Sequence, residues 1–425
     1  MRNWQNAARK IPNEEERQGM CMKKSLINVI CLLIPSRAMR KHVRFWLSEY
    51  SFSQDKEYVR AFDANVVGDK TVLVVEPSVT HGEIVPGFVQ YWLDLGYSVD
   101  VLLHRDVMRD NPFCRFKDSR LRFFNHSYTS YKSLLSSPNI NKYRYLFFST
   151  AAYARGFNKD GSVYSMRDCM TCLPQRAKSF FLVEHNLKNV RPFKEIHLLE
   201  GGRIITLAPF SWEGQRTVMV NPHYFGEVAI TPKGKPTQFI VVGALDMQRR
   251  NHNLLVDAIF SLVEMGRKDF HITVVGSGRA NIAALKAELT GTLAEHVTFT
   301  GWITFEELYA LMEKSDFLLA LMDPDNPAHQ RYITQSVSGS YQLSLGFRKP
   351  CVMHKAFTSF HNFTEKNSVL YDSGLVSAMQ QAMDMENDSY ATLQENLGEL
   401  SRQLCEDSRE NLGEAVCNIA KNEKE

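Results

Sequence analysis

Short apolar segments that alternate with longer helical segments limit the folds open to this chain. The first five are rich in Val, Leu, Ile and Phe, and polar or amphipathic stretches separate them. They are residues 70–77, 98–104, 143–150, 178–186 and 202–209. Buried strands of a parallel sheet are short apolar runs, and each needs a crossover to the next strand. The alternation therefore predicts βα units on a parallel sheet.

A second set of apolar segments follows a proline-rich interruption. Residues 221–237 contain three prolines and two glycines and few large apolar side chains, which is typical of a linker. The later apolar segments are residues 238–243, 270–278, 296–302, 316–324 and 349–355. Helical segments between them are residues 253–265, about 280–290, 305–315 and one that begins near Ser338. In the first helical segment, Leu255, Ile259 and Leu262 share one face.

These patterns predict an α/β protein of two doubly wound, Rossmann-like domains that face a cleft. The first domain is expected at residues 66–222, the linker at 223–237 and the second domain at 238–380, with a helical tail at 381–425. The default ligand site of such a pair lies in the cleft, at the carboxyl ends of the strands.

Composition excludes several function classes. The formal net charge is only +3 over 425 residues, so we expect no nucleic-acid partner. Eight cysteines are scattered along the chain, which argues against a disulfide framework. Cys169 and Cys172 form a CxxC without a second pair at zinc spacing, so we expect ordinary thiols and no metal site.

The N-terminal region differs from the rest of the chain. Residues 1–22 are polar and irregular, and we expect a disordered leader there. Residues 23–65 form a predicted basic helical arm, in which the apolar run 26–34 is flanked by basic residues. These are Lys23, Lys24, Arg37, Arg40, Lys41 and Arg44. An amphipathic basic helix binds anionic lipid, so residues 23–47 predict peripheral contact of a cytoplasmic protein with the inner face of the plasma membrane. The alternative is a terminal helix packed on the protein.

Two adjacent arginines stand where a strand passes into a helix, in the stretch VVGALDMQRRNHNLLVDAI. Gly243 ends the strand, and Arg249, Arg250 and Asn251 precede the helix. A helix N-terminus attracts anions, and guanidinium groups bind phosphate in a bidentate manner. The turn predicts a phosphate site; the alternative is a solvated basic turn.

A second candidate anion site follows at residues 328–350. Ser336, Ser338 and Gly339 stand at the expected start of a helix, and Tyr332 lies in the loop before it. Serine caps helices and glycine allows a ligand to approach the backbone. Both turns should lie on the same edge of the sheet, which suggests a diphosphate. The alternative is plain helix capping.

The glycines of VVGSGR, with Gly276 at the strand end, carry a weaker signal. A dinucleotide fingerprint needs a third glycine where this chain has Asn281, so a nicotinamide cofactor is not expected. In the first domain, His81 and Glu83 follow one strand, and Glu184 and His185 end another. They are candidate acid–base and acceptor-binding groups; the alternative is solvated loop residues.

Over residues 70–400 the chain resembles nucleotide-sugar glycosyltransferases of the GT-B fold, family-4 type, found in bacterial polysaccharide and lipopolysaccharide assembly. The similar segments are HGEIVPGFVQYWLDLGYSVDVLL, VMVNPHYF, VVGALDMQRRNHNLLVDAI, HITVVGSG, VTFTGWITFEELYALMEKSDFLLAL and GFRKPCVMH. The resemblance implies an enzyme with a UDP- or GDP-linked sugar donor and no cofactor or metal, acting on a saccharide or lipid-linked acceptor.

The resemblance also implies roles for individual residues. Arg250 matches the lysine of the family's diphosphate-binding pair, whereas Ala244 stands where an arginine is usual. The family's Glu-x7-Glu motif should fall at about 335–343, which reads QSVSGSYQL and contains no acid. Ser338 and Gly339 look like the Ser-Gly turn of related polysaccharide-assembly enzymes. The expected donor-site residues are Gly243, Arg249, Arg250, Asn251, Gly276, Tyr332, Ser336, Ser338 and Gly339; His81 and Glu83 are the expected catalytic pair.

Two alternatives to a transferase remain open. The missing glutamates would also fit a catalytically inactive scaffold of the same fold. A nucleotide-sugar epimerase shares the two-domain architecture but needs several acids and histidines in the cleft, and the second domain has few. The resemblance does not fix whether the sugar configuration is retained.

Overall fold

A computed structural model describes most of the chain from residue 52 onward. The described residues are 52–150, 155–157, 163–165, 179–191, 202–213, 215–276, 279–358, 360, 362–372 and 374–422, with the isolated residues 29, 34, 36, 39, 40 and 43. The predicted leader, most of the basic arm and the CxxC pair lie outside them. No helix in these ranges has the length and apolar character needed to cross a membrane.

The first domain is built on a seven-stranded parallel sheet in the order β3-β2-β1-β4-β7-β8-β11. Its strands are β1 (Thr71–Glu76), β2 (Ser98–His104), β3 (Leu121–His126), β4 (Tyr145–Phe148), β7 (Phe180–Glu184), β8 (Gly202–Thr206) and β11 (Val218–Met219). The order reverses between β1 and β4, which defines a switch point at their carboxyl ends.

Helices cover both faces of this sheet because alternate strand residues are apolar on both sides. Val72 and Val74 join a core with α4 (Val85–Asp94), whereas Leu73 and Val75 join a second core with α3 (Phe52–Asp63). Other first-domain elements are α5 (Arg105–Asp110), α6 (Tyr131–Leu135), η1 (Gly82–Ile84), η2 (Pro138–Lys142), η4 (Leu187–Asn189) and the strand pairs β5 (Arg155–Phe157) with β6 (Val163–Ser165) and β9 (Ser211–Trp212) with β10 (Gln215–Arg216).

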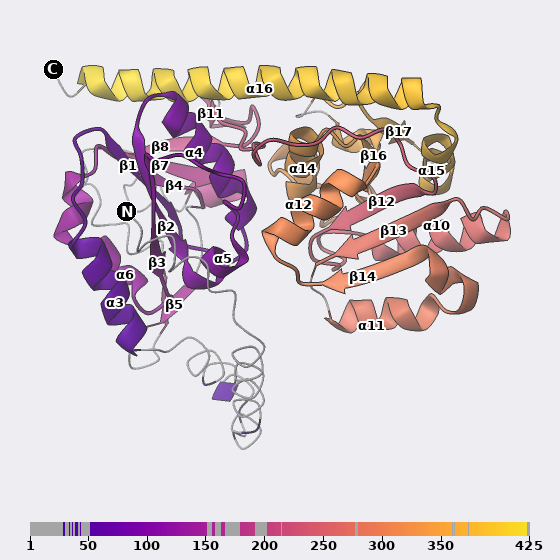
Figure 1. The fold of residues 1–425 in the computed structure, drawn as a ribbon, viewed down its shortest axis with the longest axis horizontal. Coiled ribbons are helices and arrows are strands. Elements are labelled where there is room, and N and C mark those ends of the chain that lie inside the picture. The colour runs from indigo at the N-terminus through magenta and orange to yellow at the C-terminus, as the bar shows by residue number, and fades with distance from the viewer. Residues whose placement is uncertain are drawn as a thin grey trace.

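The second domain repeats this plan with six parallel strands in the order β14-β13-β12-β15-β16-β17 (Figure 1). They are β12 (Thr237–Val242), β13 (Phe270–Val275), β14 (Val297–Gly301), β15 (Phe317–Leu319), β16 (Cys351–His354) and β17 (Val369–Tyr371). The helices are α10 (His252–Glu264), α11 (Arg279–Glu288), α12 (Phe305–Lys314), α13 (Arg331–Thr334), α14 (Gly339–Phe347) and α15 (Leu375–Asp384), with the short η5 (Gly291–His296) and η6 (Lys355–Phe357). The predicted fold class is confirmed, and Leu255, Ile259 and Leu262 are fully buried on one face of α10.

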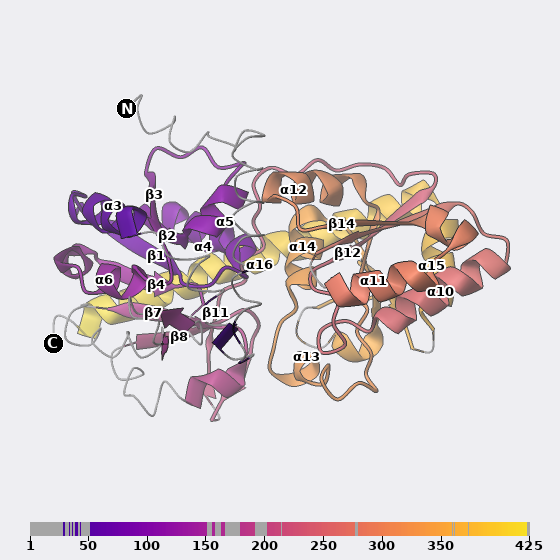
Figure 2. The ribbon, with the colours of Figure 1, turned by 90° about the horizontal axis from the view of Figure 1, so that it is seen from below.

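The last helix, α16 (Asn387–Asn422), crosses both domains (Figures 1 and 2). Near its start, the Tyr390 hydroxyl donates to the Asp316 carbonyl at 2.9 Å in the second domain. Further along, the Asn221 N–H donates to Ser408 Oγ at 2.9 Å, and Asn411 Nδ2 donates to the Met219 carbonyl at 3.0 Å. The segment expected as a helical tail therefore contacts the second domain near its start and the first domain further along.

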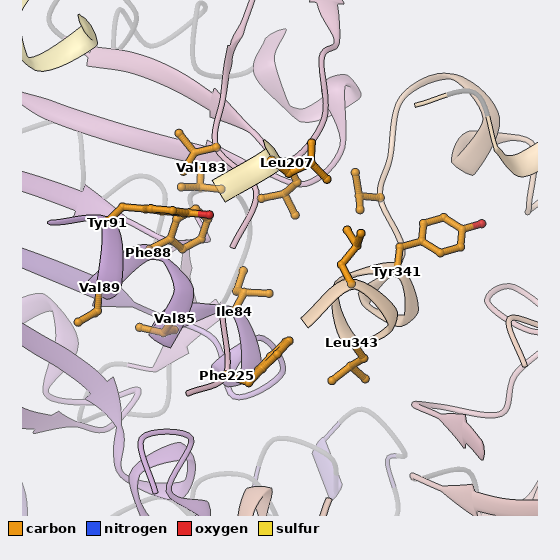
Figure 3. Close-up of a cluster of buried hydrophobic side chains, with 14 of the residues drawn as sticks. Ile84, Val85, Phe88, Val89, Tyr91, Val183, Leu207, Phe225, Tyr341 and Leu343 are labelled. Carbon is orange, nitrogen blue, oxygen red and sulfur yellow. The ribbon is translucent and has the colours of Figure 1, made fainter. Parts of the chain in front are cut away.

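The two domains share an apolar core. Ile84 and Phe88 of the first domain, Phe225 of the linker and Leu343 of α14 belong to one buried apolar cluster (Figure 3). Phe225 is 1% exposed, so this part of the linker is packed and not free. Polar contacts join the domains as well: Arg115 Nη1 lies 2.8 Å from Glu313 Oε1.

Candidate functional site

Arg250 joins the two predicted anion-binding turns. Its guanidinium is buried, 7% exposed as a residue, and Nη2 donates to Ser340 Oγ at 2.9 Å, in the first turn of α14. Nη1 donates to the Ala244 carbonyl at 3.2 Å. Gly243 has φ +112°, and a Cβ there would lie 2.7 Å from Nη1, so the strand-end glycine makes room for the guanidinium. The expectation that both turns lie on one edge of the sheet is confirmed.

Helix α14 begins near Ser338, as the sequence predicted. Ser338 is the N-cap and accepts a hydrogen bond from the Ser340 N–H at 3.3 Å, while Gly339 is exposed. A helix N-terminus carries a partial positive charge. With Arg250 beside it, this corner of the second domain is suited to an anion.

Arg249 and Asn251 flank Arg250 but have different surroundings. The Arg249 side chain is 54% exposed and lies 3.8 Å from Asp246 Oδ2. Asn251 caps α10 by accepting from the Asn253 N–H at 3.1 Å, and its Nδ2 donates to Asp323 Oδ2 at 2.8 Å. Arg249 is therefore available to a ligand, whereas the polar atoms of Asn251 are engaged within the domain.

Three other predicted donor residues make structural contacts. Gly276 has φ +139°, and a Cβ there would lie 2.4 Å from the Gly243 carbonyl oxygen, so it lets the ends of β12 and β13 approach. Tyr332 is 9% exposed, and its hydroxyl accepts from Arg331 Nη2 at 2.9 Å. Ser336 Oγ donates to the His185 carbonyl at 3.0 Å, which joins the two domains.

His81 and Glu83 lie opposite the α14 N-terminus. His81 Nδ1 is 3.9 Å from Glu83 Oε1, and a Cβ on Gly339 would lie 3.7 Å from that oxygen. Burial lowers the pKa of His81, but the carboxylates of Glu83 and Glu76 outweigh burial and leave this pKa above its ordinary value. The charge of Arg249, from the second domain, opposes the carboxylates and lowers this pKa. The structure thus brings both predicted clusters together.

His185 belongs to this cluster as a neutral side chain. Its ring centroid is 4.5 Å from that of His81, and Nε2 donates to the Ser149 carbonyl at 3.0 Å. Burial lowers the pKa of His185 to about 3, and the charge of His81 adds to this. Below it lies Glu76, whose Oε2 accepts from Ser149 Oγ at 2.7 Å.

Glu76 was not predicted as a site residue. It is fully buried, and burial raises the pKa of its carboxyl, against the opposing charge of His81. The sequence did contain a signal for Glu76. This acid ends the apolar strand in KTVLVVEP, so it must lie at the carboxyl edge of the sheet, where ligands bind.

Glu184 is the last residue of β7 and is 2% exposed. Its Oε1 accepts from the Asn186 N–H at 3.1 Å and from Asn189 Nδ2 at 2.9 Å. Burial raises the pKa of Glu184 to about 7, against these hydrogen bonds and the charge of His81, which lower it. The geometry fits a carboxyl that closes the turn after β7.

Two further features lie outside this cluster. A cavity of about 420 Å³ is lined by Gln238 and Phe270, near the amino ends of their strands and so at the opposite edge of the second sheet. Among the described residues, no three His, Cys, Asp or Glu side chains are grouped to hold a metal ion. The expectation of a metal-free reaction stays a prediction.

Comparisons with known proteins agree with the architecture. Residues 236–384 match the model of the family glycosyl transferases group 1, and no curated protein matches the chain. Sucrose-phosphate synthase from Thermosynechococcus elongatus is 13% identical, with 83% of this chain and 100% of that chain covered and a TM-score of 0.56.

Two more solved structures are similar. An alpha-glucosyltransferase in complex with UDP and DNA is 11% identical, with 81% and 95% of the chains covered and a TM-score of 0.51. The catalytic domain of starch synthase IV from Arabidopsis thaliana, bound to ADP and acarbose, is 9% identical, with 82% and 100% covered and a TM-score of 0.51. The chain therefore has the two-domain GT-B fold of these glycosyltransferases, and the family match falls within its second domain.

Proposed function

We propose that this protein transfers a sugar from a nucleotide-sugar donor to a saccharide or lipid-linked acceptor in the assembly of a cell-surface polysaccharide. One observation carries the proposal. The buried guanidinium of Arg250 bonds Ser340 at the N-terminus of α14, directly opposite the His81–Glu83 pair. A site with cations on one domain and an acid–base pair on the other suits the transfer of a sugar whose leaving group is an anion.

The donor diphosphate would bind at the second domain. Arg249, Arg250 and the Ser338–Gly339 turn supply positive charge where negative charge develops on the leaving diphosphate, and such preorganised charge lowers the barrier. The similar structures in complex with UDP and ADP support a nucleoside diphosphate as the leaving group. We propose a UDP- or GDP-linked sugar.

The acceptor would bind at the first domain. In the transfer step, the bond between the anomeric carbon and the diphosphate oxygen breaks, and the acceptor hydroxyl oxygen bonds to that carbon. The hydroxyl proton passes to the His81–Glu83 pair, and the electron pair of the broken bond leaves with the diphosphate. Neutral His185 packs against His81 and fixes the orientation of its ring.

An inactive scaffold of the same fold is the second candidate. It is favoured by the lack of any acid in residues 335–343, where Ser336 joins the domains and Ser338 caps α14. An epimerase is less well supported, because the nearest acids of the second domain are engaged: Asp246 accepts from the Gln248 N–H and Asp323 from Asn251.

The first experiment is a calorimetric titration with UDP, GDP and CMP on the wild type and on Arg250→Ala. Saturable binding of one nucleotide that Arg250→Ala abolishes would support the donor site and name the donor class. A hydrolysis assay with the matching nucleotide sugars then separates the enzyme from the scaffold. No binding of any nucleotide at millimolar concentration would contradict the proposal.

We also propose peripheral contact of residues 23–47 with the inner face of the plasma membrane, which places the protein beside a lipid-linked acceptor. The proposal depends on the sequence of residues 23–47, most of which lie outside the described residues. Flotation with vesicles that contain anionic lipid tests it. A variant without residues 1–47 should stay in the soluble fraction, whereas equal flotation of both proteins would contradict the proposal.

A further inference from the structure

The turn that carries the two arginines has all its carbonyls occupied. From Ala244 to Gln248, each carbonyl oxygen accepts a hydrogen bond. The donors are Arg250 Nη1 to Ala244, Asn281 Nδ2 to Leu245, the Arg249 and Arg250 N–H groups to Asp246, Asn326 Nδ2 to Met247 at 2.7 Å, and Arg331 Nη2 to Gln248 at 3.1 Å. Exposed turns usually leave several carbonyls to water, so this saturation is a built feature.

Three of these donors come from elements remote in sequence, and two of them, Asn326 and Arg331, make a second contact that holds them in place. Asn281 lies in α11, Asn326 in the loop after β15, and Arg331 in α13. The Asn326 side-chain oxygen accepts from the Ala328 N–H at 3.0 Å, and the Arg331 guanidinium lies 4.7 Å from the centroid of the Tyr332 ring. These two donors are therefore oriented before they reach the turn.

The carbonyls of this turn are occupied, whereas, among the described residues, the N–H groups at its start are not. In the described part of the chain, the N–H groups of Ala244–Met247 donate to no other atom. Met247 is 39% exposed, so the turn reaches the surface. Carbonyl oxygens repel an anion and N–H groups attract one. A turn whose carbonyls are held elsewhere and whose N–H groups are free is prepared for an anion.

We propose that Asn281, Asn326 and Arg331 are positioning residues for the donor diphosphate. They hold the carbonyls of residues 245, 247 and 248 away from the ligand, and the free N–H groups of residues 244–247 bind phosphate oxygens together with the arginines. This inference rests on the proposed function, because it assumes that the anion is a nucleoside diphosphate. The three side chains act through the turn and need not touch the ligand.

Asn326→Ala tests the inference without changing charge. Asn396→Ala is the matched control, because Asn396 is also half-buried and its Nδ2 donates at 2.7 Å to a backbone carbonyl, that of Lys366, far from the turn. Asn326→Ala loses the hydrogen bonds to the Met247 carbonyl and from the Ala328 N–H. We expect the loss at Met247 to weaken UDP binding about 3- to 10-fold and to leave uridine binding within about twofold. Asn396→Ala should change neither.

Amide hydrogen exchange tests the same inference without a ligand. The N–H groups of Arg249 and Arg250 donate to Asp246, and that of Asn251 donates to the Leu321 carbonyl. Their exchange should be at least about 3-fold faster in Asn326→Ala than in Asn396→Ala. Arg331→Gln, which keeps a donor and loses the charge, should exchange nearly as slowly as the wild type.

The outcomes separate the two proposals. Equal exchange in Asn326→Ala and Asn396→Ala would overturn the positioning role, whatever the protein binds. Faster exchange in a protein that binds no nucleotide would keep the positioning role and overturn the proposed function. Equal loss of UDP and uridine binding in Asn326→Ala would mean that the loop supports the whole site, and would also overturn the positioning role for phosphate.

Discussion

Replacing Gln342 with leucine should make the protein more stable. Gln342 is fully buried in α14, and neither side-chain amide atom has a hydrogen-bond partner among the described residues. It shares a helix face with Gly339 and Gly346, which approach Glu83 and the His223 carbonyl. The amide therefore faces the seam between α14, the first domain and the linker, where Ile84, Phe225 and Leu343 belong to one apolar cluster (Figure 3).

The size of the effect follows from the lost hydration of the amide. A buried polar group without a partner costs about 1–3 kcal/mol, and leucine has a similar size and no polar atoms. We expect Gln342→Leu to raise the free energy of unfolding by about 2 kcal/mol, or Tm by roughly 4–8 °C for domains of this size. Differential scanning calorimetry and urea unfolding measure both quantities.

Gln394→Leu is the control, because Gln394 is 4% exposed and its Nε2 donates to the Arg348 carbonyl at 3.4 Å. This variant should lose about 1 kcal/mol, the usual net value of one hydrogen bond. A fall in Tm for Gln342→Leu would refute the reasoning, since it would mean that the amide is satisfied in solution, for instance by a buried water.

Three more predictions concern other parts of the molecule. Gly243→Ala should weaken UDP binding at least 10-fold, because its Cβ would lie 2.7 Å from the Arg250 guanidinium and φ is +112°; titration against the proposed donor site measures this. Acid should destabilise the protein, because burial lowers the pKa of three histidines, so the unfolded state binds more protons below pH 6.5. These are His126 and His185, with pKa values of about 3, and His223, with a pKa of about 4. The raised pKa values of Glu184, about 7, and of Glu76 oppose them, so urea unfolding should show a net loss of about 1 kcal/mol per pH unit between pH 6.5 and 5; unchanged stability would contradict it. Thr304→Ala removes the capping box of α12 and should lower the free energy of unfolding by about 1 kcal/mol.

Periodicity and capping rules were enough to predict the fold. Ser338 was expected to start a helix and is the N-cap of α14, and the continuous apolar runs became central strands. The edge strand β14 was predicted, whereas the edge strands β3 and β17 were missed because they lack such runs. In β3, Arg122 faces Asp100 at 2.7 Å and polar residues interrupt the pattern, and β17 has only three residues.

The candidate site was predictable where its chemistry is local, and not where it depends on distant contacts. The arginine turn and the Ser-Gly turn are each visible in the sequence, and their meeting at Ser340 follows from the doubly wound topology. Nothing near Asn326 indicates that its amide reaches the Met247 carbonyl, because 79 residues separate the two. Glu184 stays a predicted acceptor-side residue, and its contacts with Asn186 and Asn189 were not visible in the strand pattern.

The path of α16 has a consequence for biosynthesis. Leu412, Val416 and Ile419 belong to the same apolar core as Val72 and Val74 of β1, and a Cβ on Gly413 would lie 3.4 Å from Leu95. The first domain precedes α16 in the chain and therefore lacks part of its core until α16 has been synthesised. During that interval its apolar surface beside α4 is open to chaperones or to aggregation, so the yield of folded protein depends on α16.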